Sequence, residues 1–368
     1  MVKVKTIVEK FIKKDQRRVV TFYYNNDICR KLISMKYALF VIIGMCFLTW
    51  GCQPKGKIVK FGGEAQGTYY AITYVDAKER NFQDSIDLIL KKFDSSCSIY
   101  KPNSIISRFN NNDPTAKADA NFTAVFNKAM EVSEKSNGAF DITVGQLVRA
   151  WGFSIKGKIK MDPKKVDSLK QFVGYKKIKL VDGRVIKENP NIQLDYNALA
   201  QGYSSDVLGK FLESKGIKNY LIDVGGEVLG RGRKPDGGIW SVGIERPPSD
   251  SLQKQQLEAI VSLDNRALST SGNYRKYFIK NGVKYSHTID PFTGYPVHHT
   301  LLAVSVLAEN SITADAFCTA FLVMGKEKAL EFLKHNPKLD AYLIYSDEKG
   351  TLKTQCSPGF SKIIKEQL

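Results

Sequence analysis

The chain contains few of the side chains that build metal centres and disulfide frameworks. Its 368 residues include four histidines, six cysteines and three tryptophans. The cysteines are widely spaced and form neither a CxxC pair nor a zinc-ligand spacing, which excludes a zinc module and leaves no deducible disulfide pattern. No internal repeat or low-complexity tract interrupts the sequence. We therefore expect a globular protein with one large core or two smaller ones.

Acidic residues are scarce relative to basic ones. Lys and Arg number 55 against 37 Asp and Glu, which gives a net charge of +18. Such an excess would suit a nucleic-acid-binding protein, because Lys and Arg neutralise phosphates. However, residues 1–34 hold nine Lys and Arg against three acids, and the other lysines are scattered along the chain. We interpret most of the charge as a solvated surface and rank nucleic-acid binding last.

The apolar run at residues 37–50 is too short for a comfortable membrane span, which needs about 20 residues. It follows Lys36 and ends at Gly51-Cys52, a pattern typical of the signal peptide of a bacterial lipoprotein. We predict a signal peptide at 35–51 and a lipidated tether at 52–57 that begins with Cys52. The protein would then be exported and anchored to a bacterial membrane, where it would face the periplasm or the cell exterior. An uncleaved N-terminal anchor is the alternative. Because Met35 starts a complete signal, residues 1–34 are a dispensable or untranslated extension in this interpretation.

Residues 58–368 have the pattern of a mixed α and β domain. Apolar residues at helical spacing predict helices at 84–94, 121–136, 197–215, 311–324 and 326–335. Alternating and β-branched stretches predict strands at 57–75 (two strands), 219–224, 239–245, 258–263 and 302–308. Asp182-Gly183 and Asn281-Gly282 are two-residue hairpin turns. Hairpins outnumber parallel crossovers, so we expect an α+β fold with largely antiparallel mixed sheets packed with helices.

One candidate metal site lies on the predicted helix 311–324. Asp315 and Thr319 are four residues apart, so both oxygens lie on one helical face. Carboxylate and hydroxyl oxygens suit Mg²⁺, whereas the neighbouring Cys318 is a soft and poor magnesium ligand. An acid near a helix start also interacts favourably with the helix dipole, so the pair by itself leaves both explanations open.

Other stretches carry polar groups beside glycines or aromatic residues. In "SNGAFDITV", Phe140 and Asp141 offer a ring and a carboxylate for a heteroaromatic ligand, although Phe140 could equally belong to the core. Gly225-Gly226 permits either a close backbone approach or a tight turn. In the stretch 267–278, the hydroxyl side chains and Arg275 could bind phosphate groups. The imidazole of His287, whose ordinary pKa is about 6.5, would suit a general base; its structural alternative is to cap the Asp290-Pro291 turn.

In their order and spacing these motifs resemble the ApbE flavin transferases. The resemblance covers roughly Ile58 to Leu333 and rests on "GTYY", "GAFDITVGQLV..WGF", "VGGEVLG", "TSGNYRKYF", "SHTIDPFTGYPV" and "ADAFCTAF". It implies an ApbE-like (T-fold-like) fold and an Mg²⁺-dependent FAD:protein FMN transferase. Such an enzyme moves FMN from FAD onto a Thr or Ser hydroxyl of an acceptor redox protein subunit and releases AMP.

The resemblance also implies roles for individual residues. The flavin-binding positions would be Gln66, Tyr100, Ala139, Phe140, Asp141, Asp195, Gln201 and Ile289. The magnesium positions would be Asp315, Thr319, the Ala198 carbonyl and Cys318, with His287 as the general base. Two positions depart from the family pattern: Gln201 stands where lysine is common, and Cys318 stands where some members have an acid.

Two other functions remain open at this stage. The same fold and metal could transfer FMN to water, which would make the protein an FAD pyrophosphatase. A flavin-binding lipoprotein without catalysis is the alternative of another class. Asp315 and Thr319 would form a metal pair and His287 a base. This combination favours an enzyme, because binding alone requires neither a metal pair nor a base.

Overall fold

The computed structural model describes residues 56–153, 161–248, 256–273, 277–280 and 283–368. The predicted signal peptide at 35–51, the lipidation site Cys52 and the extension 1–34 lie outside these ranges. Within them, no helix is both long enough and apolar enough to cross a membrane.

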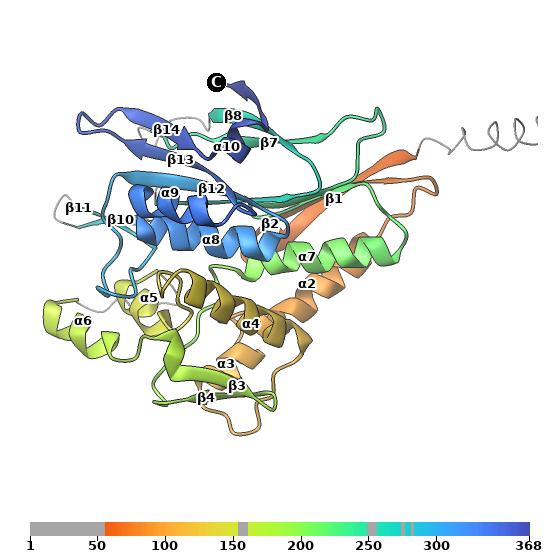
Figure 1. The fold of residues 1–368 in the computed structure, drawn as a ribbon. Coiled ribbons are helices and arrows are strands. Elements are labelled where there is room, and N and C mark those ends of the chain that lie inside the picture. Colours follow the sequence, from red (N-terminus) through yellow and green to blue (C-terminus); the bar gives the residue numbers. More distant parts are fainter. Residues whose placement is uncertain (1–55, 154–160, 249–255, 274–276, 281–282) are drawn as a thin grey trace, which may run out of the picture. The chain divides into compact units, whose positions relative to one another are not determined.

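An eight-stranded sheet forms the centre of the domain, with the strand order β1-β2-β5-β6-β9-β12-β13-β14 (Figure 1). Every neighbouring pair in it is antiparallel, which confirms the predicted α+β class with largely antiparallel sheets. The strands are β1 (Lys57–Ala65), β2 (Thr68–Asp76), β5 (Tyr220–Val224), β6 (Glu227–Arg231), β9 (Ala267–Gly272), β12 (Leu301–Ala308), β13 (Asp340–Ser346) and β14 (Leu352–Cys356).

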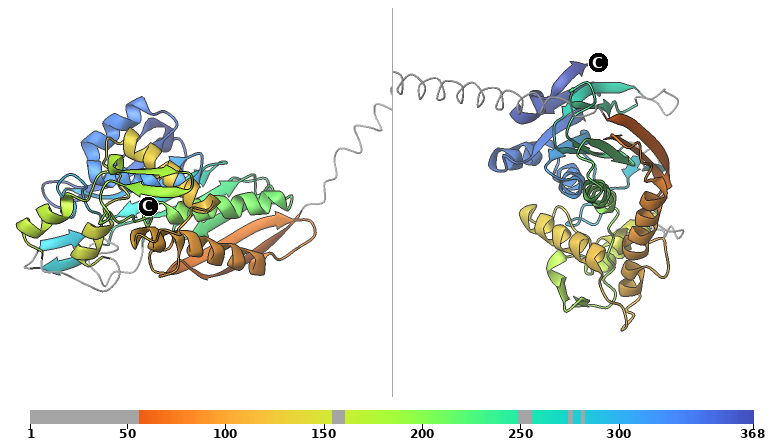
Figure 2. Two further views of the ribbon diagram at one scale, coloured as in Figure 1. Left: turned by 90° about the horizontal axis from the view of Figure 1, so that it is seen from below. Right: turned by 90° about the vertical axis from the view of Figure 1, so that its right-hand side faces the viewer.

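Helices cover one face of this sheet. α7 (Ala200–Ser214) and α8 (Ser311–Met324) lie side by side against it, and Figure 2 (right) shows both nearly end-on. α8 is buried on almost every side, which explains its nearly continuous apolar sequence. The main core joins Val304 and Val306 of β12 to Phe317 and Phe321 of α8. α2 (Gln83–Cys97) packs against β1 and α7, and α9 (Lys326–His335) against β13 and α8, whereas α4 (Ala120–Lys135) lies beneath α8 (Figure 1).

A small sheet covers the opposite face. It has the order β15 (Ile364–Gln367), β8 (Leu257–Leu263) and β7 (Trp240–Glu245). Trp240 and Val261 of this sheet form a second core with Val228 and Leu268 of the central sheet. The large sheet is therefore buried on both faces, between helices and a second sheet.

The lower part of the molecule in Figure 1 is built from short elements. These are α3 (Ile105–Asn110), α5 (Gly145–Trp151), α6 (Pro163–Lys170), the short helix Tyr175–Lys177, and the hairpin of β3 (Ile178–Val181) and β4 (Arg184–Lys187). Asp182 and Gly183 both have positive φ at the hairpin turn, as predicted. A third core of Leu147, Trp151, Val166 and Ile289 ties α5 and α6 to the segment after His287.

All five predicted helices are confirmed, as α2, α4, α7, α8 and α9. α7 begins at Ala200, three residues later than the predicted 197. β10 (Tyr277–Lys280) and β11 (Val283–Ser286) pair as a hairpin, although the predicted turn Asn281-Gly282 lies outside the described residues. α10 (Pro358–Ser361) leads into β15.

Candidate active site

The two central helices approach each other closely at Gly202. A Cβ atom at this position would lie 2.5 Å from Ser311 O and 2.7 Å from Asp315 Cβ. No side chain larger than hydrogen fits there without moving backbone atoms. The glycine in "NALAQGYSSD" therefore brings the start of α7 against the first turns of α8.

Asp315 of α8 provides the missing cap of α7. The N-cap residue of α7, Leu199, makes no side-chain capping bond, whereas Gly202 N donates to Asp315 Oδ2 at 2.9 Å. In a continuous helix this amide would donate to the Ala198 carbonyl, four residues earlier. Burial raises the pKa of Asp315 to about 7, the Gly202 amide opposes this rise, and the nearby charge of Asp206 adds to it.

Asp206 of α7 caps α8 in return. Its Oδ1 and Oδ2 accept hydrogen bonds from Ser311 N at 2.8 Å and from Ile312 N at 2.9 Å. Burial raises the pKa of this carboxyl to about 6. Each helix thus supplies the carboxylate that satisfies free amides at the start of the other.

The oxygens around Asp315 fit a magnesium ion. The described residues give its carboxylate a single hydrogen-bond donor, Gly202 N, and Thr319 is half-buried one turn further along α8. Ala198 lies in the turn just before α7, and its carbonyl is released in the sense that Gly202 N, its partner in a continuous helix, donates to Asp315. Carboxylate, hydroxyl and carbonyl oxygens are the donors that Mg²⁺ prefers, with water completing the shell. Asp315, Thr319 and the Ala198 carbonyl would hold the ion.

The Cys318 thiol is directed away from this set. It donates to Ser269 O of β9 at 2.8 Å and to Val304 O of β12 at 3.4 Å, and burial raises its pKa well above the usual range. Metals bind the thiolate rather than the thiol, so this placement favours a core role for Cys318. In the part of the chain that the structure covers, no three His, Cys, Asp or Glu side chains gather into a metal cluster.

A polar corner lies where the β1–β2 turn meets the start of α7. Ser204 Oγ donates to Gln66 Oε1 at 3.3 Å, while the buried Gln66 Nε2 has no hydrogen-bond partner among the described residues. A Cβ on Gly225 would lie 2.7 Å from Thr68 Cγ2 and 3.2 Å from Gln201 Nε2. The structure thus brings Gln66 and Gln201 together, with an unused buried donor that a ligand acceptor would satisfy.

A second group of predicted flavin-binding residues lies next to the turn before α7. Asp195 N donates to Ile142 O at 2.7 Å, which joins the stretch 139–144 to the stretch 193–195. The Asp195 carboxylate accepts from Asn197 N, and Asn197 Nδ2 donates to the hydroxyl of Tyr100, whose side chain is 55% exposed. Burial and the charge of Asp195 raise the pKa of Tyr100.

Asp141 and its neighbours are also buried. Asp141 Oδ1 accepts from Thr143 N and Thr143 Oγ1 at 2.8 and 2.6 Å, and Oδ2 accepts from Tyr175 N at 2.7 Å. Burial nevertheless raises its pKa. Phe140 is 1% exposed and belongs to the main core, so its ring packs inside the protein, as in the core alternative. Ala139 is also buried, and these residues would meet a ligand through their backbone.

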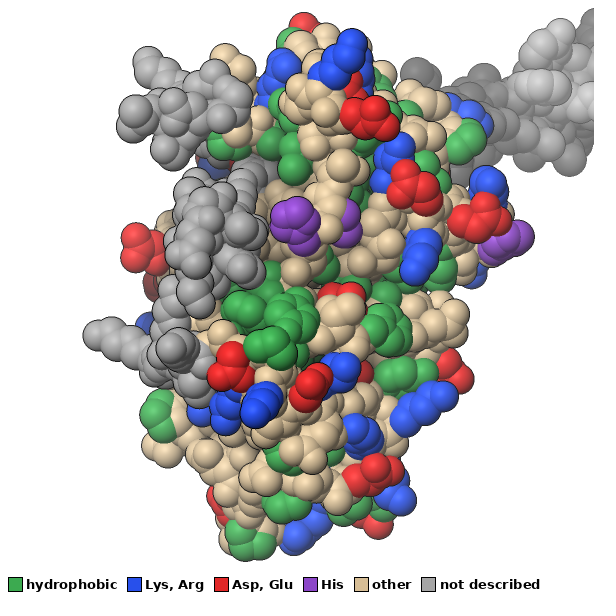
Figure 3. All heavy atoms as spheres, turned by 90° about the vertical axis from the view of Figure 1, so that its left-hand side faces the viewer, with side chains coloured by type: hydrophobic (Ala, Val, Ile, Leu, Met, Phe, Trp, Pro, Cys, Tyr) green, Lys and Arg blue, Asp and Glu red, His purple; other side chains and the backbone are tan. Residues whose placement is uncertain are grey.

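His287 directly follows β11 and is half-buried. Two residues later, Ile289 forms a bridge with Pro296 and packs in the third core. The intervening turn is closed by Gly294 N, which donates to Asp290 O at 2.8 Å, and is held by Trp151 Nε1, which donates to Gly294 O at 2.9 Å. One face of the molecule shows histidine side chains close to a patch of hydrophobic side chains (Figure 3).

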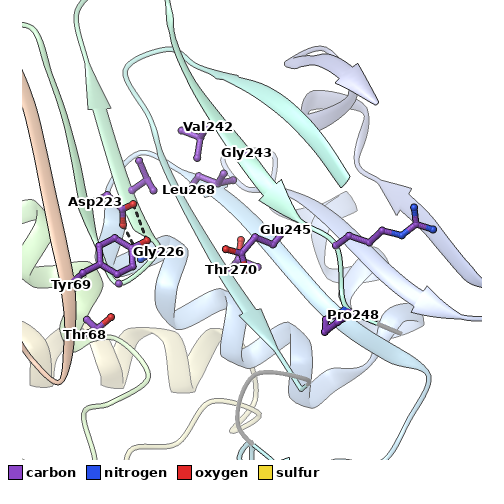
Figure 4. Close-up of a pocket in the computed structure, with 13 residues that line it drawn as sticks. Thr68, Tyr69, Asp223, Gly226, Val242, Gly243, Glu245, Pro248, Leu268 and Thr270 are labelled. Carbon is purple, nitrogen blue, oxygen red and sulfur yellow. Dashed lines mark hydrogen bonds between the residues drawn. The ribbon is translucent and has the colours of Figure 1, made fainter. Parts of the chain in front are cut away.

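A cavity of about 490 Å³ lies on the other face of the central sheet. Thr68, Tyr69, Asp223 and Gly226 form one wall, and residues of β7 form another (Figure 4). Asp223 accepts hydrogen bonds from Tyr69 OH at 3.1 Å and from Gly226 N at 2.8 Å. Gly225 lines the cavity and also borders the polar corner, so a single turn separates the two spaces.

Sequence reasoning assigned no role to Asp206, although it ends the stretch "QLDYNALAQGYSSD". The available signal was its position four residues after Gly202, which places both residues on one face of a helix. Thr270, one of the hydroxyl residues that could bind phosphate groups, pairs with Ser305 Oγ at 2.7 Å and also lines the cavity beside β7. Arg275 lies outside the described residues.

Comparison with known proteins identifies the family. The sequence model of the ApbE family matches residues 66–343. The chain belongs to the ApbE family. It is 32% identical over 348 residues to a Haemophilus influenzae protein named FAD:protein FMN transferase, an alignment that covers 91% of this chain and 98% of the relative. An Escherichia coli protein of the same name is 32% identical over 354 residues, with 90% and 99% covered.

Solved ApbE structures share the fold. The flavin transferase ApbE from Vibrio cholerae superposes with a TM-score of 0.75 at 30% identity, over 84% of this chain and 99% of that one. The apo flavinyl transferase ApbE from Pseudomonas stutzeri gives 0.75 at 30% identity, over 85% and 98%. These likenesses confirm the predicted ApbE-like fold, and the residues matched by the family model include Gln66, Gln201 and Asp315.

Proposed function

We propose that this protein is an Mg²⁺-dependent FAD:protein FMN transferase, which moves FMN from FAD onto a Thr or Ser hydroxyl of an acceptor redox subunit and releases AMP. Membership of the ApbE family and the names of its relatives support the enzyme class. The single observation that carries the proposal is the buried Asp315 carboxylate at the start of α7, beside the released Ala198 carbonyl. Asp315 of α8 thus reaches the start of α7, which also carries Gln201, and Gln201 borders the polar corner.

In the proposed reaction the acceptor oxygen forms a bond to the phosphorus of the FMN half of FAD. The bridging P–O bond of the pyrophosphate breaks, and AMP leaves with the bridging oxygen. The hydroxyl proton passes to the imidazole of His287, which acts as general base. Such chemistry needs alignment and charge neutralisation more than covalent help from the protein.

Asp315, Thr319 and the Ala198 carbonyl hold the metal in this proposal. Mg²⁺ supplies neutralisation of the charge on the pyrophosphate oxygens. Gln66 and Gln201 donate hydrogen bonds to the dinucleotide, and Tyr100, Asp141, Asp195 and the backbone of 139–140 line the flavin nucleotide site with Ile289. Gln201 offers a neutral donor where a lysine would give a stronger charge-assisted bond.

Hydrolysis is the second candidate function, because the same fold and metal site could transfer FMN to water instead of to a protein hydroxyl, and small changes around the metal would decide between the two. The test is to incubate the purified protein with FAD, Mg²⁺ and a candidate acceptor, a secreted or membrane redox subunit. Mass spectrometry of the acceptor and chromatography of AMP are the readouts. Covalently bound FMN together with AMP supports transfer. AMP with free FMN and an unmodified acceptor indicates hydrolysis, and no AMP at all contradicts both enzymes and leaves flavin binding without catalysis.

We also propose that the enzyme is exported and attached to a membrane through a lipid on Cys52. The short apolar run after Lys36 and the following Gly51-Cys52 support this assignment. Cell fractionation and mass spectrometry of the mature N-terminus test it. A Cys52→Ala variant that stays in the membrane fraction with its apolar segment intact would instead indicate an uncleaved anchor.

A further inference from the structure

α7 and α8 are connected by two carboxylates one helical turn apart. Gly202 and Asp206 are separated by four residues on α7, and the amides of Ser311 and Ile312 precede Asp315 on α8 by about one turn. Asp206 binds the start of α8, and Asp315 binds the start of α7. Each helix supplies one carboxylate and receives the other, so sliding one helix along the other breaks both contacts.

α8 already has a cap of its own. The side chain of Asn310, its N-cap residue, accepts a hydrogen bond from Thr313 N at 3.1 Å. The Asp206 carboxyl is 8% exposed, and burying a carboxylate opposes ionisation, as its raised pKa of about 6 shows. The amides of Ile312 and Ser311 lower this pKa, as do Arg231 and Lys210 to a smaller extent, and together they only partly offset the burial. Helix formation alone therefore does not account for a second, costly cap that comes from another helix.

We infer that Asp206 is a positioning residue for the metal site: it fixes the start of α8 against α7 and so sets where Asp315 and Thr319 lie relative to the Ala198 carbonyl. This inference rests on the proposed Mg²⁺ site. Asp206 touches neither the metal nor the substrate. It acts through the backbone amides of Ser311 and Ile312, which lead directly into the turn that carries Asp315.

Residues that orient metal ligands typically change metal affinity 10- to 100-fold when they are replaced. For Asp206→Ala we expect Mg²⁺ binding to weaken at least about tenfold, with FAD affinity near the wild-type value. The turnover number at saturating Mg²⁺ should change less than the Mg²⁺ concentration needed for half-maximal rate, because the ligands themselves remain.

The test compares three variants of the full chain. Mg²⁺ is titrated calorimetrically into the FAD-free protein, and the Mg²⁺ dependence of AMP release is measured separately. Asn310→Ala is the matched control, because it removes a side-chain cap from the same helix end without touching α7. Asp206→Glu keeps the negative charge but displaces it by one methylene, which separates position from charge.

The inference is supported if Asp206→Ala and Asp206→Glu both weaken Mg²⁺ binding while Asn310→Ala lowers only the melting temperature. Equal weakening by Asn310→Ala would show that general fraying of α8 is responsible, which overturns the inference. If Asp206→Glu binds Mg²⁺ as tightly as the wild type, the charge of residue 206 rather than its position is responsible, and the inference is overturned as well. If wild-type protein binds Mg²⁺ and Asp206→Ala binds it equally well, this inference alone fails; if the wild type binds no Mg²⁺, the proposed metal site fails with it.

Discussion

Gly202 and Ser311 bring two helix starts so close together that a methyl group at residue 202 would lie 2.5 Å from Ser311 O. The contact involves backbone, so a rotamer change cannot relieve it. We expect Gly202→Ala to push α7 and α8 apart and to stretch the bond from Gly202 N to Asp315. The same displacement would move both helix starts of the proposed metal site.

The Gly202→Ala variant should lose about 1–3 kcal/mol of unfolding free energy, as overpacked core positions do, together with most of its activity. Chemical denaturation and AMP release measure the two effects. Gly238→Ala is the control, because its added Cβ would meet only side-chain atoms that can move, those of Asp236 from 3.0 Å and Lys234 Cε at 3.6 Å. Wild-type stability in Gly202→Ala would show that the helix pair adapts and would contradict the close-contact argument.

His287→Ala should abolish FMN transfer and leave FAD affinity largely intact, since the base acts on the acceptor hydroxyl. General bases contribute typically 10²–10⁴-fold to rate. FAD binding by fluorescence and transfer by mass spectrometry separate the two effects. His298→Ala, which removes an exposed histidine eleven residues later, is the control. Near-normal transfer by His287→Ala would refute the assignment of the base.

Gln201→Lys should bind FAD more tightly, because an ammonium donor replaces an amide next to the pyrophosphate. Charge-assisted hydrogen bonds are roughly twice as strong as neutral ones, so a gain of up to about tenfold is expected. Equilibrium titration of FAD measures it. Gln171→Lys makes the same change on the exposed end of α6 and should alter nothing. Unchanged affinity in Gln201→Lys would mean that another group already supplies the charge.

Cys318→Ala should leave the Mg²⁺ dependence of activity unchanged and lower the stability by about 1 kcal/mol, because it removes a buried thiol and its two carbonyl contacts. Enzyme assays across a range of Mg²⁺ concentrations, with thermal unfolding, measure both quantities. A tenfold rise in the Mg²⁺ requirement would restore Cys318 to the set of metal ligands.

Acid should weaken the protein through Asp76, which accepts hydrogen bonds from Arg80 Nε at 2.7 Å and from Arg80 N at 3.0 Å. These bonds lower the pKa of Asp76 to about 2 from an ordinary value of 3.8. A carboxyl whose folded pKa is depressed stabilises the fold above its unfolded pKa, and this stabilisation is lost as pH falls from about 4 towards 2.

The Asp76→Asn variant should therefore lose less stability than the wild type between pH 4 and pH 2. At pH 7 it should be less stable by about 1 kcal/mol, a modest figure because Arg80 is 37% exposed and partly screened. Urea unfolding at several pH values measures both differences. The exposed Asp167→Asn serves as control. Parallel acid profiles for Asp76→Asn and the wild type would remove Asp76 from the explanation.

Strong local patterns made part of this fold predictable. Phe122, Val125 and Phe126 fall on the buried face of α4, and Asp182-Gly183 forms the expected hairpin turn. The short helices α5 and α6 were not predicted, since seven or eight residues carry too little periodicity. The pairing of β9 with β6 and β12 depends on contacts between distant segments, which local spacing does not encode.

The start of α7 shows the same limit at the candidate site. A local N-cap would have marked the boundary, but the cap is Asp315, which lies 113 residues further along the chain. The sequence indicated Asp315 and Thr319 by their spacing, yet the reciprocal role of Asp206 depends on the packing of two helices. The roles of Phe140 and Cys318 likewise depend on where each side chain points, which residue type alone does not determine.

The buried thiol of Cys318 has a chemical consequence for the whole molecule. Cys318 is fully enclosed, and Cys97 at the end of α2 is 3% exposed with its pKa raised to about 12 by burial. Oxidants and alkylating reagents attack accessible thiolates, so neither sulfur offers a target in the folded protein. The third free cysteine of the described residues, Cys356, is only half-buried, so labelling of Cys97 and Cys318, compared with that of Cys356, would report unfolding directly.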